Sequence, residues 1–234
     1  MRRRIDVCRR RAGEKASYHE VFVFETDDED STVASALRAI NNQDLILTEE
    51  GTETTPIQWE SSCLQKKCGA CAMVISGTPR LACATKLADL VDDPITLEPL
   101  HTFACVADLI VDRQTMFDNL SAATTWLEGE ADLADKRWPV AMEASRCLQC
   151  GICLEVCPNF SCENAFSGMA QMVPLARLLA ETPKDERKRL ARSWKDHVYG
   201  GCGKSLACRD VCPAKIDIGR LMARSNAAVL WHRW

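Results

Sequence analysis

Fourteen cysteines in 234 residues restrict the possible folds of this chain more than any other feature. Most of them fall in three groups, and Cys8, Cys105 and Cys162 stand apart. The groups are Cys63, Cys68, Cys71 and Cys83, then Cys147, Cys150, Cys153 and Cys157, then Cys202, Cys208 and Cys212. Clustered thiols pair as disulfides in secreted proteins and bind metal in intracellular ones, so the expected compartment decides between the two.

The N-terminal sequence favours metal binding. Met1 to Arg4 is basic, but the stretch from Ile5 to Arg10, which contains three charged residues, follows where the apolar core of a signal peptide is required. No run of about 18 or more apolar residues occurs, so we expect no membrane span. The thiols are therefore expected to be reduced in a cytosolic compartment. The net charge of -4 implies no nucleic-acid partner.

The first cysteine group has the spacing of plant-type [2Fe–2S] ferredoxins, Cys63-x4-Cys68-x2-Cys71 with Cys83 further on. Two irons bridged by two sulfides need two thiolates each, so four cysteines must converge. Gly69 allows the loop backbone to approach the cluster and direct N–H groups at its sulfur atoms. Such hydrogen bonds raise the reduction potential of the cluster. A structural zinc site is the alternative, but zinc motifs usually pair two C-x2-C units, so the spacing favours [2Fe–2S].

The second group, Cys147-x2-Cys150-x2-Cys153-x3-Cys157-Pro158, matches the bacterial ferredoxin run. In two-cluster ferredoxins the fourth cysteine of each run ligates the other cluster. Cys157 is therefore assigned to a neighbouring cluster, and the other three cysteines to the first one.

The third group is the same run with Ser205 in place of its second cysteine: Cys202-x2-Ser205-x2-Cys208-x3-Cys212-Pro213. The crossing rule predicts a [4Fe–4S] cluster on Cys147, Cys150, Cys153 and Cys212. It leaves Cys157, Cys202 and Cys208 for the other cluster, and a cubane with three protein ligands tends to lose one iron, which predicts [3Fe–4S]. Two alternatives stay open: Ser205 ligates a fourth iron through oxygen, or Cys162 replaces the missing cysteine.

The remaining sequence indicates a carrier without bond chemistry of its own. Cys8, Cys105 and Cys162 are interpreted as small core hydrophobes. No Ser/His/Asp set, phosphate loop or paired-carboxylate site occurs, so no catalytic residue is assigned.

The hydrophobic pattern predicts an α+β chain of two domains. Alternation predicts strands at 5–10, 18–25, 73–75 and 95–97, and Ser31 or Thr32 is expected to cap a helix with Val33, Ala36, Leu37 and Ile40 inside. Helical spacing follows at 113–127, 165–181, 185–196 and 215–230, with Pro174 and Pro183 expected to break or start helices. We predict a β-grasp [2Fe–2S] domain over 1–105 and a helical two-cluster ferredoxin domain over 106–234.

The order of the three motifs resembles that of the iron–sulfur subunit of succinate dehydrogenase and fumarate reductase. The segments that carry the resemblance run from Ser62 to Met73, Pro79 to Cys83, Asp108 to Asp112, Arg146 to Pro158 and Cys208 to Pro213. The resemblance covers about Ile5 to Ala228, nearly the whole chain.

This resemblance implies an electron-transfer subunit that relays electrons between FAD in a flavoprotein partner and a quinone at a membrane anchor, which in some members also holds haem. It places the chain on the cytoplasmic face of the membrane, held there by the anchor. Some members carry a tryptophan after the Cys-Pro of the second motif and a histidine after the first cysteine of the third. This chain has Asn159 to Cys162 and Gly203 there, which fits a menaquinone-type or divergent anchor better than a ubiquinone-type one.

Two other functions compete with this one. An iron–sulfur relay for a different flavin-dependent enoate reductase requires no change in this chain. A free ferredoxin-type carrier is disfavoured by the two fused domains. Co-purification with a flavoprotein distinguishes the subunit from the free carrier.

Overall fold

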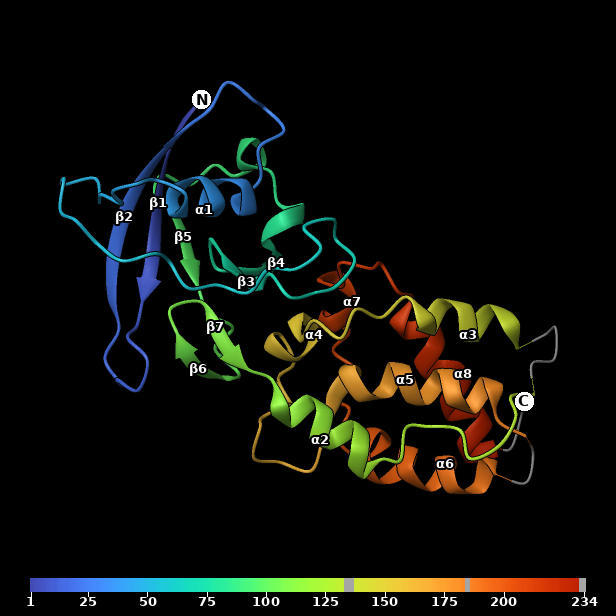
Figure 1. The fold of residues 1–234 in the computed structure, drawn as a ribbon. Helices are drawn as coiled ribbons and strands as arrows, with labels where there is room; N and C mark the ends of the chain where they lie inside the picture. Colours follow the sequence, from blue (N-terminus) through green and yellow to red (C-terminus); the bar gives the residue numbers. More distant parts are fainter. Residues whose placement is uncertain (133–136, 184–185, 232–234) are drawn as a thin grey trace. The chain divides into compact units, whose positions relative to one another are not determined.

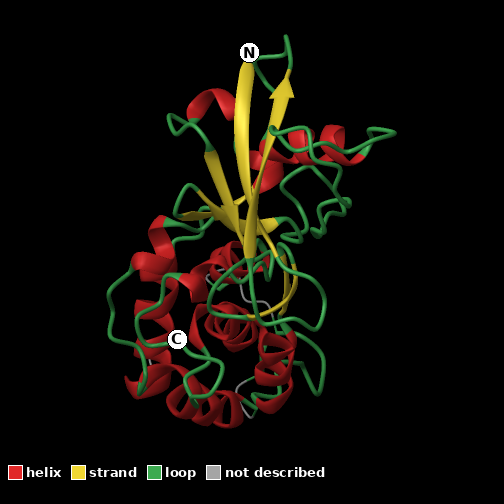
Figure 2. Cartoon of the chain, turned by 90° about the vertical axis from the view of Figure 1, so that its left-hand side faces the viewer, coloured by secondary structure: helices red, strands yellow, loops and turns green. Residues whose placement is uncertain are grey.

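The computed structural model describes residues 1–132, 137–183 and 186–231, and it divides the chain into two compact units, Met1–Asp112 and Arg113–Trp234. The first unit contains the strands of the described residues, and the second unit is built from helices (Figures 1 and 2). The predicted boundary at residue 105 falls inside a strand of the first unit, Ala104–Ala107, which pairs with Ile110–Asp112. Among the described residues, no helix combines the length and the apolar character needed to cross a membrane.

The first unit is built on a mixed five-stranded sheet with the order β2-β1-β5-β3-β4. Its strands are β1 (Arg2–Arg9), β2 (Tyr18–Glu25), β3 (Ala72–Ile75), β4 (Thr78–Leu81) and β5 (Ile95–Glu98). The pairs β1–β2 and β3–β4 are antiparallel hairpins, and β1 runs parallel to β5 with Ile5 opposite Ile95. This is the predicted β-grasp arrangement, in which a helix connects the first hairpin to the rest of the sheet.

That helix, α1 (Val33–Asn41), begins where the sequence predicts. The Thr32 side chain accepts a hydrogen bond from the Ser35 backbone N–H, and the Ser35 hydroxyl accepts one from the Thr32 backbone N–H, so each residue satisfies an N–H that lacks a helical partner. The predicted apolar face is buried, and α1 packs against β2 and the short 3₁₀ turn η1 (Ala82–Ala84). A second 3₁₀ turn, η2 (Leu87–Asp89), follows η1.

A two-stranded ribbon of β6 (Ala104–Ala107) and β7 (Ile110–Asp112) completes the first unit. Asp108 lies at its turn with a left-handed φ of 43°, a conformation that aspartate tolerates better than most residues. Its carboxylate accepts hydrogen bonds from the backbone N–H groups of Arg10 and Gln58, both at 2.8 Å. Asp108 therefore joins the end of β1 to the segment that leads into the first cysteine loop.

The second unit packs helices around α5 (Gly168–Glu181), whose residues are almost all buried. The surrounding elements are α2 (Gln114–Ala122), α3 (Trp138–Ser145), α4 (Ile152–Glu155), α6 (Arg187–Trp194), the π-helical turn η3 (Lys195–Tyr199), α7 (Ala207–Asp210) and α8 (Ile218–Trp231). Helix α5 contacts α2, α3, α4, α6 and α8. The predicted helices correspond to α2, α5, α6 and α8; position 185, where one of them was expected to begin, lies outside the described residues.

The expectation that Pro174 breaks or starts a helix is wrong, because Pro174 lies inside α5. Pro183 does follow the end of α5, since Thr182 is its C-cap. Helices α3, α4 and α7 were not predicted from the sequence. Two of these are single turns between cysteines, too short for a hydrophobic period to appear.

Candidate iron–sulfur sites

Three cysteines of the first group, Cys63, Cys68 and Cys71, lie on the loop that leads into β3, and Cys83 lies in η1 after β4. Two backbone N–H groups, those of Gln65 and Lys67, donate to the Cys63 Sγ at 3.3 Å. The Lys66 N–H donates to the Cys83 Sγ, also at 3.3 Å. The loop achieves this by adopting left-handed φ values at Leu64, Lys66 and Gly69. Successive N–H groups thus point at sulfur, an arrangement that stabilises anionic thiolates and sulfides.

Two thiols of the first cysteine group, those of Cys63 and Cys71, have opposite environments. The N–H donors from Gln65 and Lys67 lower the pKa of the half-buried Cys63 thiol to about 7. Burial raises the pKa of the Cys71 thiol to about 12, because the apolar surroundings disfavour a lone thiolate. Cys63 therefore loses its proton more easily than an ordinary thiol. Cys71 needs a positively charged metal centre beside it before it loses its proton.

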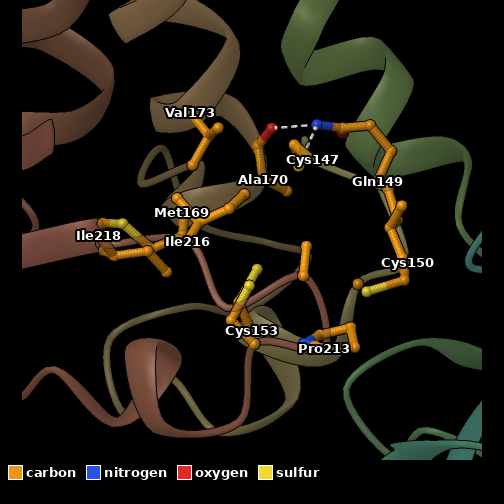
Figure 3. Close-up of a pocket in the computed structure, with 14 residues that line it drawn as sticks. Cys147, Gln149, Cys150, Cys153, Met169, Ala170, Val173, Pro213, Ile216 and Ile218 are labelled. Carbon is orange, nitrogen blue, oxygen red and sulfur yellow. Dashed lines mark hydrogen bonds between the residues drawn. The ribbon is translucent and has the colours of Figure 1, made fainter. Parts of the chain in front are cut away.

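In the second unit, the four cysteines that are predicted to bind the [4Fe–4S] cluster line one cavity. Figure 3 shows a close-up of this cavity. Cys147, Cys150, Cys153 and Cys212 all line it, together with an apolar wall that includes Met169 of α5 and Ile218 of α8. Burial raises the pKa of Cys150 to about 11. Four sulfur donors around an apolar space fit a [4Fe–4S] cluster, whose soft irons bind thiolates.

A second cavity gathers the remaining thiols. Cys157, Cys202 and Cys208 line it, and Ser205 is also among its lining residues. Burial raises the pKa of Cys208 to about 11. Cys162 is exposed and does not line this cavity within the described part of the chain. The structure thus places Ser205, and not Cys162, beside the three-cysteine set.

The two cavities group the cysteines as the crossing rule predicts, because Cys212 joins the second run and Cys157 joins the third. Whether the thiols ligate clusters stays a prediction. In the described residues, no three His, Cys, Asp or Glu side chains stand close enough to hold one metal ion, and the thiols instead line the walls of larger spaces.

The second and third cysteine runs share their backbone conformation as well as their cysteine spacing. Gln149 and Lys204 occupy equivalent positions in the two runs, with left-handed φ values of 50° and 59°. Gly151 and Leu206, again equivalent, precede α4 and α7 with φ values of 83° and 60°. Ser205 therefore occupies the place of Cys150 in a repeated structure. Leucine at a left-handed position gives no sequence signal for this turn, which is why it was not predicted.

The three remaining cysteines differ from one another. Cys8 and Cys105 are half-buried in the first unit, whereas Cys162 is exposed. The expectation of a core role for Cys162 is therefore wrong.

The fold and the grouped thiols define a class of protein, an iron–sulfur electron carrier with a plant-type and a bacterial-type ferredoxin unit in one chain. Two domain families agree with this: one described as a 2Fe-2S iron-sulfur cluster binding domain matches residues 4–118, and one described as a 4Fe-4S dicluster domain matches residues 143–216.

Comparison with known proteins identifies the family. The chain is 38% identical over 205 residues to the succinate dehydrogenase iron-sulfur subunit of Bacillus subtilis, covering 83% of this chain and 79% of that one. It is 32% identical to the fumarate reductase iron-sulfur subunit of Wolinella succinogenes, covering 69% and 73%. The chain belongs to the family of succinate dehydrogenase and fumarate reductase iron–sulfur subunits, which carry three clusters.

A solved structure described as the Mycobacterium smegmatis Sdh1 complex in the apo form contains a chain of the same fold. The TM-score is 0.76 at 22% identity, and the match covers 96% of this chain and 95% of that one. The likeness extends through both units and supports the α+β fold class.

Proposed function

We propose that this chain is the non-catalytic electron-transfer subunit of a succinate:quinone oxidoreductase, relaying electrons between FAD in a flavoprotein and a quinone at a membrane anchor. The observation that carries the proposal is the crossed grouping of thiols, with Cys212 in the cavity of the second run and Cys157 in that of the third. This grouping is the one required for two adjacent cubane-type clusters.

The proposed ligands use one sulfur set for each cluster. Cys63, Cys68, Cys71 and Cys83 hold [2Fe–2S], Cys147, Cys150, Cys153 and Cys212 hold [4Fe–4S], and Cys157, Cys202 and Cys208 hold [3Fe–4S]. When bound, the clusters supply one-electron redox chemistry. Ser205 leaves the third set without a fourth thiolate at the position where Cys150 completes the second.

Other residues of these sites are proposed to adjust the reduction potentials of the clusters. Backbone N–H groups of Gln65, Lys66 and Lys67 donate to cysteine sulfur and favour the reduced, more negative state. The walls of the four-cysteine cavity include the apolar side chains of Met169, Ile216 and Ile218, and apolar surroundings lower the local dielectric around a bound cluster. Hydrogen bonding and burial are the means by which a protein adjusts a cluster's potential.

The proposed cellular position is peripheral, on the cytoplasmic face of the membrane and attached through an anchor subunit that holds the quinone. The family membership supports this position. The stretch from Asn159 to Cys162 supplies no tryptophan, so the contacts with quinone are proposed to come mainly from the anchor.

Co-purification tests the assignment. A tagged chain is expected to emerge with a flavoprotein and a membrane subunit, with about nine irons per chain from the three clusters together. The complex is expected to oxidise succinate or reduce fumarate. A chain that emerges alone, soluble and monomeric contradicts the subunit function and supports a free carrier, and zinc in place of iron contradicts all cluster assignments.

Cys212→Ser tests the crossed ligation. We expect loss or alteration of the four-iron EPR signal, while the oxidised three-iron signal is affected less. Cys157→Ser is the matched control and is expected to affect the three-iron signal first. The reverse pattern contradicts the crossing rule for this chain.

A further inference from the structure

Pro174 interrupts the hydrogen bonding of α5 beside the four-cysteine cavity. In a regular helix the N–H of residue 174 donates to the carbonyl of Ala170, four residues earlier. Proline has no N–H, and its ring also pushes against that carbonyl. Pro174 therefore leaves the Ala170 carbonyl in need of another donor.

The side chain of Gln149 supplies that donor. Its Nε2 lies 2.9 Å from the Ala170 carbonyl oxygen and 3.2 Å from the Sγ of Cys147 (Figure 3). A carbonyl oxygen can only accept, so the NH₂ group, and not the amide oxygen, must face Ala170, and the same nitrogen is then the donor to the Cys147 sulfur. The two N–H bonds of one amide are thus divided between the helix carbonyl and a thiol of the cavity.

The backbone brings the same residue to the same sulfur. Gln149 has a left-handed φ of 50° and lies two residues after Cys147. The Gln149 Oε1 is buried and has no hydrogen-bond partner among the described residues, an arrangement that ordinarily costs stability. A side chain that only filled space here would not need an amide, so the contacts made by Nε2 account for its presence.

We infer that Pro174 and Gln149 form a positioning pair that raises the reduction potential of the four-iron cluster: the proline frees the Ala170 carbonyl, and this carbonyl holds the Gln149 amide so that its second N–H donates to Cys147. A donor to a ligand sulfur stabilises the reduced cluster more than the oxidised one, because the reduced cluster carries more negative charge. The inference rests on the proposed ligation of a [4Fe–4S] cluster by Cys147.

Gln149→Met tests the pair in the purified complex, because methionine keeps the length of the side chain and removes both donors. The measurement is an EPR-monitored redox titration of all three clusters. Loss of one charge-assisted hydrogen bond is expected to disfavour the reduced four-iron cluster about tenfold, which corresponds to a fall of about 59 mV for one electron. The two-iron cluster in the same sample is the internal control and is expected to keep its potential.

Pro174→Ala provides a second test that leaves Gln149 in place. Alanine restores the helical N–H, which competes with Gln149 for the Ala170 carbonyl and loosens the amide. A smaller fall in the four-iron potential is expected. If Gln149→Met fails to retain the four-iron cluster, the four-iron potential of Pro174→Ala tests the inference in its place.

An unchanged four-iron potential in a variant that retains the cluster overturns the inference, as does an equal shift of the two-iron cluster, which indicates a general effect. Absence of a four-iron signal from the unaltered complex overturns the ligand assignment itself. The failure of the inference and the failure of the proposed function are therefore distinguishable.

Discussion

Replacing Asp108 with alanine is expected to destabilise the first unit, because this carboxylate is buried and serves several groups at once. The Asp108 Oδ2 lies 3.2 Å from the Nε of Arg9, and the two side chains are only 5% and 2% exposed. Arg9 also pairs with Glu20 at 2.9 Å, and its Nη2 donates to the carbonyls of Thr55 and Pro56. Arg9 Nε and Nη1 make no hydrogen bond among the described residues, but the ion-pair distances are short enough for strong attraction in a buried site.

The expected loss follows from the groups that alanine leaves unsatisfied. The N–H groups of Arg10 and Gln58 each lose a charged acceptor at 2.8 Å, which costs about 1.5 kcal/mol apiece. The left-handed φ of 43° costs alanine roughly 1 kcal/mol more. The total of about 4 kcal/mol agrees with the range of about 3–5 kcal/mol for breaking a buried ion pair. Arg9 retains Glu20, so the loss is not expected to exceed this range.

Urea unfolding of the complex, followed by the visible absorbance of the two-iron cluster, measures this loss. Asp108→Asn tolerates the left-handed turn and keeps one acceptor, so it is expected to lose about half as much. Asp44→Ala, at an exposed position of the same unit, is the matched control and is expected to change stability by less than about 0.5 kcal/mol. A loss below about 1 kcal/mol for Asp108→Ala refutes the reasoning that the buried carboxylate holds this region together.

Three further substitutions address the second unit. Ser205→Cys is expected to replace the oxidised three-iron EPR signal with that of a four-iron cluster, because Ser205 stands where Cys150 stands in the other run; persistence of the three-iron signal argues against this equivalence. Cys162→Ser is expected to leave the three-iron signal unchanged, since Cys162 is exposed, and loss of the signal would revive Cys162 as a ligand. Gly168→Ala is expected to cost about 2–4 kcal/mol in thermal unfolding, because the φ is +67° and the added Cβ comes within 2.4 Å of the Leu154 Cδ2. An unchanged melting temperature contradicts this prediction and shows that the Leu154 side chain on α4 moves aside without loss of stability.

The elements that the sequence predicts well are those with local causes. The Thr32 cap and the apolar spacing of Val33 to Ile40 are sufficient to predict α1, since both act within a few residues. Strand β2 has the predicted limits because its alternation is uninterrupted. The sequence predicts helix α5 in outline but not a proline inside it, because the donor that compensates for the proline comes from Gln149, a residue distant in the sequence.

The spacing of the cysteines by itself determined the number and type of the predicted clusters and the crossed grouping of Cys157 and Cys212. Such spacing is informative because a cluster of fixed size demands a short loop of fixed length. Only the tertiary structure decided which distant groups meet. Asp108 reaches Arg10 across 98 positions of sequence, and Gln149 reaches Ala170 across 21. No local pattern encodes such contacts, because they depend on how the strands and helices pack.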